Sequence, residues 1–259
     1  MGKDLKRYSD MLHEAETKRT PIAPLTEVDP SLSIDDAYAI QLANVDRAVR
    51  EGRAISGKKI GLTSPGIQAQ FGVGEPDYGH LLDMMDCSAT GDVPTDELLQ
   101  PKIEGEIAFI LKEDLDGGKI TAADVRARTD HVVAAFEIVD SRIADWKIKL
   151  VDTVSDNASS GRYVLGAKEL PIDAVDLPSV PMRLTKGGVE IASGTGAAVM
   201  GDPAEAVAWL ANKMWSYGVT LKKGEVVLSG AFSAACEVRK GDEFVADFGP
   251  LGTVSARFI

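Results

Sequence analysis

The sequence predicts an α+β fold, in which a helical N-terminal part covers a larger strand-rich core. Residues 4–18 are rich in good helix formers, and residues 33–52 carry apolar side chains at helical spacing. From Gly57 onward, short apolar runs are separated by Gly, Pro and Asp. Because these runs do not alternate regularly with helices, a doubly wound parallel sheet is disfavoured. We expect a helical N-terminal cap region over residues 1–55 and a strand-rich core over residues 56–259.

Two helices have marked starting signals. Ser33 and Asp36 form a capping-box-like start, with Asp in place of the usual Glu or Gln, and Gly52 closes this element. A later helix is predicted to begin at Pro203, because Asp202 suits the N-cap and proline suits the first helical position. The structural role expected for the apolar side chains of both helices is core packing.

The core is predicted to consist of strands, read from short apolar runs bounded by turn residues. These runs are residues 59–63, 104–111, 132–139, 163–165, 180–184, 226–228, 244–248 and 253–259. A glycine-rich segment, residues 194–201, does not have the spacing of a dinucleotide-binding loop. We expect a tight turn or a close backbone contact there.

Composition limits the classes of function. The chain has 28 Lys plus Arg and 40 Asp plus Glu, so its net charge is −12, which disfavours nucleic acid and anionic membranes as partners. Its two cysteines cannot form a disulfide framework, and no apolar stretch approaches the length of a membrane span. The charged N-terminus lacks the apolar segment of a secretory signal. We expect a cytoplasmic protein that acts on a small molecule.

Several common catalytic motifs are missing from the sequence. There is no GxxxxGK[ST] phosphate-binding loop and no GxSxG nucleophile elbow. Only three histidines are present, so a histidine-rich metal site is poorly supported. The chemistry is therefore sought among the carboxylates.

The strongest chemical feature is a pair of glutamates within one apolar run. If residues 101–111 form a strand, Glu104 and Glu106 point to the same face, and Gly105 leaves the opposite face open. Two carboxylates that converge repel each other, and a hard divalent cation such as Mg²⁺ or Mn²⁺ relieves that repulsion. The alternative is an exposed strand face with two solvated glutamates.

A third carboxylate raises the case for a metal. Glu137 lies inside the apolar run 132–139, where a buried charge is costly unless it is paired or bound to a metal. It is the natural third ligand. The alternative is an internal ion pair with Arg142 or with a lysine.

Three further segments could complete a site. Lys59 begins a glycine-flanked strand and can enter a cleft to hold an anionic substrate, although lysines are commonly solvated. Residues 75–79, with Asp77 at their centre, have the composition of a turn. Residues 152–161 form a polar loop of small residues that includes Ser159 and Ser160 and can offer hydroxyls to a carboxylate. Together these elements suit a 2-oxo acid or enolate that chelates a metal through two oxygens.

The same segments resemble the 2-hydroxypenta-2,4-dienoate (2-keto-4-pentenoate) hydratases of the fumarylacetoacetate-hydrolase superfamily, a branch that also contains the 4-oxalocrotonate decarboxylases. The resemblance extends from about residue 33 to the C-terminus. The segments that carry it are GKKIGLTS (57–64), EPDYGHL (75–81), IEGEIAFIL (103–111), FEIVDSRIADWKIKLVDTVSDNASSG (136–161), GAAVMGDPAEAVAWLAN (196–212) and LGTVSARFI (251–259).

The resemblance implies a strand-rich mixed-sheet core of the fumarylacetoacetate-hydrolase type, with residues 56–259 as the catalytic core. It implies Mg²⁺ or Mn²⁺ held by Glu104, Glu106 and Glu137. It also implies a homo-oligomer, with a decarboxylase as a candidate partner, and a place in the meta-cleavage degradation of aromatic compounds. No histidine fits the water-activating dyad of the superfamily's C–C hydrolases.

Residue roles follow from the same resemblance. Lys59 would face the carboxylate and 2-oxo group of the substrate, with Ser159 or Ser160 nearby, and Asp77 would be the general acid/base. The hydratases resemble PDYG or PDFG at Asp77, whereas the decarboxylases carry an apolar residue there. We expect a hydratase that converts a 2-hydroxy-2,4-dienoate to a 4-hydroxy-2-oxo acid. The alternatives are a decarboxylase of 2-oxo-3-enedioates and a non-catalytic scaffold subunit.

Overall fold

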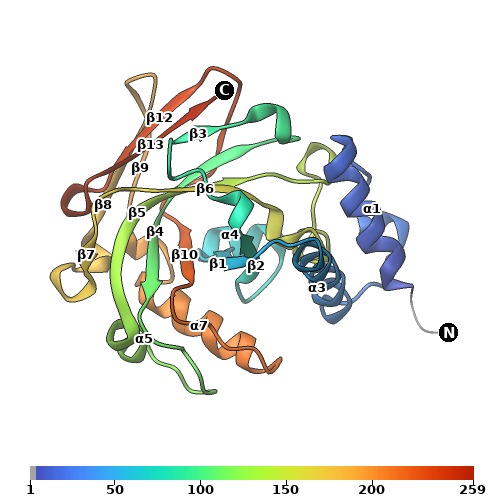
Figure 1. Cartoon of the computed structure of the whole chain (residues 1–259), viewed down its shortest axis with the longest axis horizontal. Coiled ribbons are helices and arrows are strands. Elements are labelled where there is room, and N and C mark those ends of the chain that lie inside the picture. The colour runs from blue at the N-terminus through green and yellow to red at the C-terminus, as the bar shows by residue number, and fades with distance from the viewer. Residues whose placement is uncertain (1–3) are drawn as a thin grey trace.

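The computed structural model describes residues 4–259, which form two β-sheets and several helices. The α-helices are α1 (Leu5–Lys18), α2 (Leu25–Val28), α3 (Ile34–Arg50), α4 (Pro65–Phe71), α5 (Ala122–Arg128), α6 (Leu150–Ser155) and α7 (Pro203–Trp215). Helices α1 and α3 lie at the right and α5 and α7 at the bottom of Figure 1. The strands are β1 (Ile55–Gly61), β2 (Asp77–Leu82), β3 (Asp92–Val93), β4 (Lys102–Leu111), β5 (Thr129–Val139), β6 (Ser160–Leu165), β7 (Leu170–Pro171), β8 (Pro181–Lys186), β9 (Val189–Thr195), β10 (Val226–Ala231), β11 (Cys236–Glu237), β12 (Glu243–Asp247) and β13 (Thr253–Phe258).

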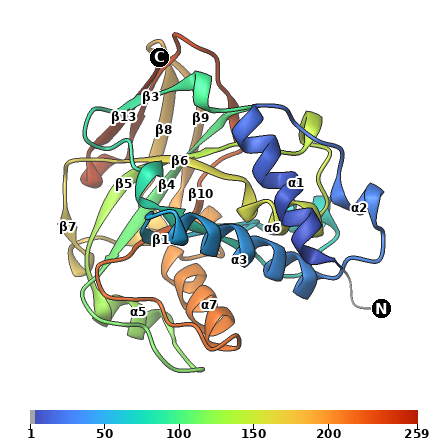
Figure 2. The ribbon, with the colours of Figure 1, turned by 45° about the vertical axis from the view of Figure 1, so that its right-hand side comes forward.

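The two helices with marked starting signals, α3 and α7, begin where the sequence predicts. The capping box of α3 is formed by Ser33 and Asp36, as expected, and α7 begins at Pro203 behind the Asp202 N-cap. Helices α1 and α3 lie together beside α6 (Figure 2). Apolar side chains of these helices form a small cluster of their own, and Val151 packs against both this cluster and the main core. The boundary predicted near residue 55 stays a prediction.

Two sheets of mixed strand direction make up the core, which confirms the predicted α+β class. The larger sheet has the order β2-β1-β10-β4-β5-β6, with β11 and β7 paired beside β4 and β5, and the smaller has the order β3-β13-β12-β8-β9. Strand β1 is parallel to β10, whereas β4 and β5 pair antiparallel along nearly their whole length. Each of the predicted strands is present, and the sequence did not indicate five further strands, β2, β3, β7, β9 and β11.

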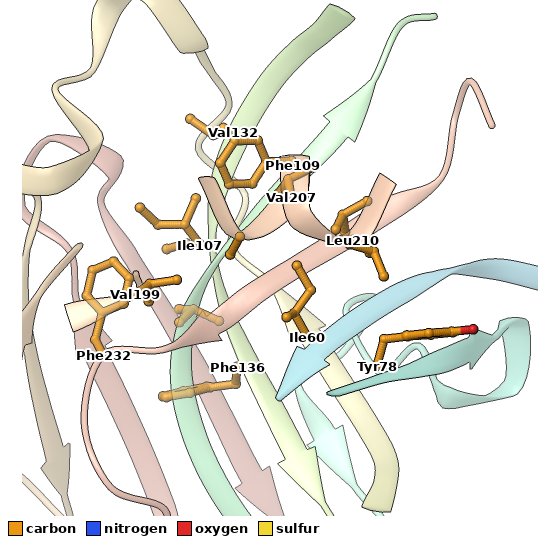
Figure 3. Packing of buried hydrophobic residues seen from close by; sticks show 14 of the residues in the cluster. Ile60, Tyr78, Ile107, Phe109, Val132, Phe136, Val199, Val207, Leu210 and Phe232 are labelled. Atoms are coloured by element: carbon orange, nitrogen blue, oxygen red, sulfur yellow. The ribbon is translucent and has the colours of Figure 1, made fainter. Parts of the chain in front are cut away.

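The central strand β4 has two different faces. Ile103, Ile107 and Phe109 point into the main hydrophobic cluster, where residues of β5, α7 and the smaller sheet surround them (Figure 3). The prediction that Gly105 leaves this face open is wrong, because a Cβ there would lie 3.3 Å from Phe248 Cζ. The smaller sheet packs against the glycine. The opposite face of β4 carries the two glutamates.

Two local predictions are wrong for a shared reason. Asp77 begins the buried strand β2 rather than lying in a turn, because it pairs with Gly61 of β1. Residues 152–155 belong to helix α6, and only the following residues, Asn157–Ser159, form the tight turn of a loop. In both segments polar composition indicates a turn, but tertiary partners satisfy the polar groups. The segment 194–201 does make the expected close contact, since a Cβ at Gly194 would lie 2.2 Å from the Phe232 carbonyl oxygen.

Candidate active site

The three predicted glutamates converge on one point. Glu104 lies directly opposite Glu137 in the β4–β5 ladder, and Glu106 follows on the same face of β4. One carboxylate oxygen from each of the three residues lies within 4.8 Å of the others. The strand geometry that the sequence indicated therefore gathers these side chains, and the expectation of two solvated glutamates is wrong.

Burial makes this cluster unstable without a positive partner. Glu106 and Glu137 are fully buried, and Oε1 of Glu106 and Oε2 of Glu137 have no hydrogen-bond partner within the described part of the chain. The remaining oxygen of Glu106 accepts the Gly230 N–H at 2.8 Å. Burial, reinforced by mutual repulsion, raises the pKa of Glu104 to about 7 and holds that of Glu106 well above its ordinary value.

These donors suit a hard divalent cation. All three are carboxylates whose ligand oxygens lie within 4.8 Å of one another. The unpartnered oxygens of Glu106 and Glu137 are also buried. Oxygen donors of this kind favour ions such as Mg²⁺, Mn²⁺ or Ca²⁺ over softer metals. The site of this chain therefore fits a divalent metal, which Glu104, Glu106 and Glu137 could hold.

Lys59 is the cation of the site. Its Nζ lies 3.1 Å from Glu137 Oε1, and both side chains are almost completely buried. Burial opposes the charge of the lysine, but Glu137 and the neighbouring carboxylates more than offset that effect and raise its pKa. The alternative of a lysine ion pair for Glu137 is thus realised, and it coexists with the carboxylate cluster. Arg142, the other suggested partner, pairs instead with Asp156.

Asp77 reaches the same site from the neighbouring strand. It stands opposite Gly61, two residues beyond Lys59 on β1, so that both side chains lie on one face of the sheet. A Cβ at Gly61 would lie 2.2 Å from Asp77 Oδ1, so only glycine leaves room for the carboxylate there. That oxygen has no hydrogen-bond partner among residues 4–259, and burial raises the pKa of Asp77. A buried carboxyl group with a free oxygen can exchange a proton with a ligand.

The two predicted serines are placed differently. Ser159 lies in the tight turn after α6, lines the cavity described below, and has its Oγ 3.4 Å from Thr153 Oγ1. Ser160 turns its hydroxyl away and donates to the Asn157 carbonyl oxygen at 2.7 Å. It lines a separate cavity behind the loop. The structure thus brings Ser159, but not Ser160, to the carboxylate site.

A cavity of about 520 Å³ opens above the glutamates. Lys59, Asp77 and Glu104 lie along it, and its walls come from β1, α4, the turn after α6, and the loop after β10. Phe71, Trp146 and Phe232 provide the apolar part of the wall, which no sequence pattern indicated. Isolated aromatic residues carry no spacing signal that could have revealed them. The cavity is large enough for a small organic acid with a short tail.

The α+β core holds a cluster of three carboxylates, and Glu104 of this cluster lines one cavity together with Lys59 and Asp77. This arrangement defines a metal-dependent enzyme acting on a small anionic molecule. Comparison with known proteins identifies the family. Residues 88–259 match the family model of the fumarylacetoacetate hydrolase C-terminal domain. The chain is 46% identical to 2-keto-4-pentenoate hydratase of Paraburkholderia xenovorans, over 95% of this chain and 92% of that protein. It is 44% identical to 2-hydroxyhexa-2,4-dienoate hydratase of Comamonas testosteroni, over 98% and 97% of the two chains.

Solved structures agree with this placement. The 4-oxalocrotonate decarboxylase of Pseudomonas putida G7, complexed with magnesium and adipate, superimposes with a TM-score of 0.94 at 34% identity, and the match covers 100% of this chain and 99% of that one. This chain therefore belongs to the fumarylacetoacetate hydrolase family, in the branch of the 2-keto-4-pentenoate hydratases. The predicted family, fold and hydro-lyase class are confirmed. No helix among residues 4–259 is long and apolar enough to cross a membrane.

Proposed function

We propose that this chain is a divalent-metal-dependent hydratase that adds water to a 2-hydroxy-2,4-dienoate and yields a 4-hydroxy-2-oxo acid. The observation that carries the proposal is the convergence of Glu104, Glu106 and Glu137 with Lys59 and Asp77 at one cavity. Relatives at 46% and 44% identity that are named as hydratases of such dienoates support the substrate class.

The proposed cofactor is Mg²⁺ or Mn²⁺. When bound, such an ion supplies Lewis-acid stabilisation of the negative charge that develops on the oxygens of a 2-oxo acid. Glu104, Glu106 and Glu137 would hold it, because their oxygens converge and those of Glu106 and Glu137 include buried atoms without a hydrogen-bond partner in the described structure. The buried ammonium of Lys59 adds a fixed positive charge for the substrate's carboxylate and 2-oxygen.

Asp77 is the proposed proton carrier. The reaction needs a proton delivered to C5 of the dienol as its hydroxyl proton is lost, which gives a 2-oxo-3-enoate. Water then adds across the C3–C4 double bond, with hydroxyl at C4 and a proton at C3. The raised pKa of Asp77 and its unpartnered Oδ1 favour a carboxyl group that gives and takes protons at the cavity. Ser159 is the proposed hydroxyl donor to the substrate, and the loop that carries it closes the opposite wall.

Decarboxylation of a 2-oxo-3-enedioate is the second candidate. The similarity to 4-oxalocrotonate decarboxylase favours it, because the same cation and lysine would stabilise the enolate that remains after CO₂ leaves. Asp77 favours hydration, since loss of CO₂ supplies the electron pair and needs no carboxyl group to deprotonate water. A scaffold subunit without activity has no need of three converging carboxylates.

The test is an ultraviolet assay of 2-hydroxypenta-2,4-dienoate consumption, run in EDTA and with added Mg²⁺ or Mn²⁺, with the products identified. The proposal expects metal-dependent loss of the dienoate and formation of 4-hydroxy-2-oxopentanoate. Release of CO₂ from 4-oxalocrotonate without hydration of the dienoate would establish the decarboxylase instead. Absence of both metal binding and turnover would establish the scaffold.

A further inference from the structure

The loop that carries Ser159 has an unusual backbone. Asn157, Ala158 and Ser159 have φ values of 54°, 49° and 55°. Residues other than glycine rarely adopt the left-handed region, and three in succession persist only where the surroundings fix them. The contacts that fix this loop therefore bear on where Ser159 and Ala158 face the catalytic cavity.

Arg142 brackets the strained residues from both sides. Its Nη1 donates to the Ser160 carbonyl oxygen at 2.9 Å, beyond the loop, and its Nη2 donates to the Asp156 carbonyl oxygen, before the loop. Its backbone N–H donates to Asp156 Oδ2 at 2.9 Å, and its Nε donates to Asp156 Oδ1. The side chain is buried and follows β5 by three residues, so it extends from the rigid strand that also carries Glu137.

A second clamp ties the loop to β2. The side-chain amide of Asn157 accepts from the His80 N–H at 2.8 Å and donates to the His80 carbonyl oxygen at 2.9 Å. Glycine at position 79 allows this approach, because a Cβ there would lie 2.3 Å from the Asn157 carbonyl oxygen. His80 is in turn held by Gln41 of α3, whose Oε1 lies 2.9 Å from His80 Nδ1. The loop is thus fixed against both the strand of Glu137 and the strand of Asp77.

Neither clamp touches the space where a substrate would lie. Ala158 and Ser159 line the catalytic cavity, whereas Arg142 and Asn157 line a second cavity of about 360 Å³ behind the loop. The loop is therefore a wall between two cavities. Arg142 and Asn157 therefore hold its strained shape from the side away from the substrate.

We infer that Arg142 is a positioning residue, which sets the binding of the 2-oxo acid by holding Ala158 and Ser159 in their left-handed conformation. The inference rests on the proposed function for the class of ligand. The planar guanidinium matters more than its charge, because one fork spans the two carbonyl groups that flank the loop and the Asp156 carboxylate. A lysine at this position keeps the charge and loses the fork.

The test measures binding of oxalate, an inert mimic of a 2-oxo acid enolate, to the Mn²⁺-loaded chain by titration calorimetry. Arg142→Lys is expected to weaken oxalate binding by about 10- to 100-fold, the range that loss of a supporting contact commonly costs. Mn²⁺ affinity is expected to stay unchanged, since the three glutamates lie on β4 and β5. For the hydration reaction, KM should rise more than kcat falls.

Ala158→Gly supplies the rescue. Glycine adopts a positive φ without strain, so Arg142→Lys/Ala158→Gly should recover a large part of the lost oxalate affinity. A purely structural role predicts a lower Tm with unchanged oxalate affinity in the folded fraction, and no rescue. Asn157→Ala, which removes the other clamp, keeps the test decisive if the Arg142 variant does not fold, because it should weaken oxalate binding in the same way.

Each outcome separates the two proposals. If the wild-type chain binds Mn²⁺ but not oxalate, the 2-oxo acid site of the proposed function fails. If the wild-type chain binds oxalate and Arg142→Lys binds it equally well, the proposed function stands and the positioning role of Arg142 is overturned.

Discussion

Two groups of buried carboxylates lie within the same core, and they differ in their partners. Asp152 accepts hydrogen bonds from the Thr26 N–H at 2.9 Å, the Thr26 hydroxyl at 2.8 Å and the Lys149 N–H at 2.9 Å. Glu106, equally buried, has one oxygen on the Gly230 N–H and the other without a partner in the described structure. Asp152 and Glu106 are therefore equally buried, but of the two only the Asp152 carboxylate has hydrogen-bond partners for both of its oxygens among residues 4–259.

Two further buried carboxylates outside the glutamate cluster are hydrogen-bonded in the same way as Asp152. Asp156 is paired with Arg142, and the Asp140 carboxylate accepts the backbone N–H groups of Leu99 and Gln100. A buried carboxylate that is fully hydrogen-bonded holds segments together, as Asp152 joins the N-terminal segment to α6. An orphaned oxygen is instead costly to the fold and is expected where a ligand completes it. Replacing a carboxylate by its amide should therefore impair metal binding in the glutamate cluster, and should lower stability at a hydrogen-bonded carboxylate such as Asp152.

The largest effect is expected from Glu106→Gln. Loss of one ligand charge should abolish detectable turnover and weaken Mn²⁺ binding by more than the roughly 100-fold that outer contacts of a metal site commonly cost. The metal-free Tm should not fall, because the amide cannot ionise and so cannot place a buried charge beside the other glutamates. Calorimetric titration with Mn²⁺ and thermal unfolding in EDTA measure the two quantities.

Asp152→Asn is the matched control for that variant. It replaces a hydrogen-bonded carboxylate and should lower the free energy of unfolding by about 1–3 kcal/mol. Mn²⁺ affinity and kcat of the folded protein should stay as they are. A substitution at Asp152 that changed metal affinity while sparing stability would remove the distinction between the two groups.

Asp77→Asn should slow turnover by about 10²- to 10⁴-fold, because an amide cannot carry the proton. Metal affinity should be retained, since Asp77 lies on β2 and is not one of the three clustered glutamates. Steady-state kinetics with saturating Mn²⁺ provide the measurement. A variant that turns over at the wild-type rate would exclude Asp77 as the proton carrier.

Lys59→Met should lower kcat by about 10²- to 10³-fold, the range for loss of one group that stabilises developing negative charge. Substrate affinity should fall as well, because the buried ammonium beside Glu137 would be gone. An unchanged KM together with reduced kcat would limit the lysine to the transition state. Oxalate binding to the Mn²⁺-loaded variant distinguishes these two results.

The smallest expected effect is on the pH dependence of thermal stability, which should differ between the metal-free and the Mn²⁺-loaded protein. Burial raises the pKa of Glu104 from its ordinary 4.5 to about 7, and the pKa values of Glu106 and Glu137 are also raised. The metal-free folded protein therefore holds more protons than the unfolded chain in this range, and the contribution of these groups to stability falls as pH rises from about 4.5 through 7. Metal binding needs the deprotonated carboxylates, so the gain in Tm on adding Mn²⁺ should grow with pH. Thermal unfolding with EDTA and with Mn²⁺ across this range tests both trends, and a metal-free Tm that rises with pH would contradict the first.

The carboxylate cluster was predictable because the signals for it lie within short stretches of sequence. Strand alternation places Glu104 and Glu106 on one face, and a glutamate inside an apolar run, as at Glu137, implies an unusual partner. By contrast, Asp77 and Arg142 were misjudged. The composition around Asp77 is that of a turn, and Arg142 is five residues from Glu137 but pairs with Asp156.

The sequence alone determined the α+β class, most of the long core strands and the three clustered glutamates, because apolar periodicity and side-chain alternation are properties of neighbouring residues. Only the tertiary structure decided which buried carboxylates are satisfied, that Ser159 rather than Ser160 faces the cavity, and that Arg142 fixes the loop between two cavities. These properties depend on contacts between segments far apart in the chain. No local pattern of residue types encodes the position of a partner that another segment supplies.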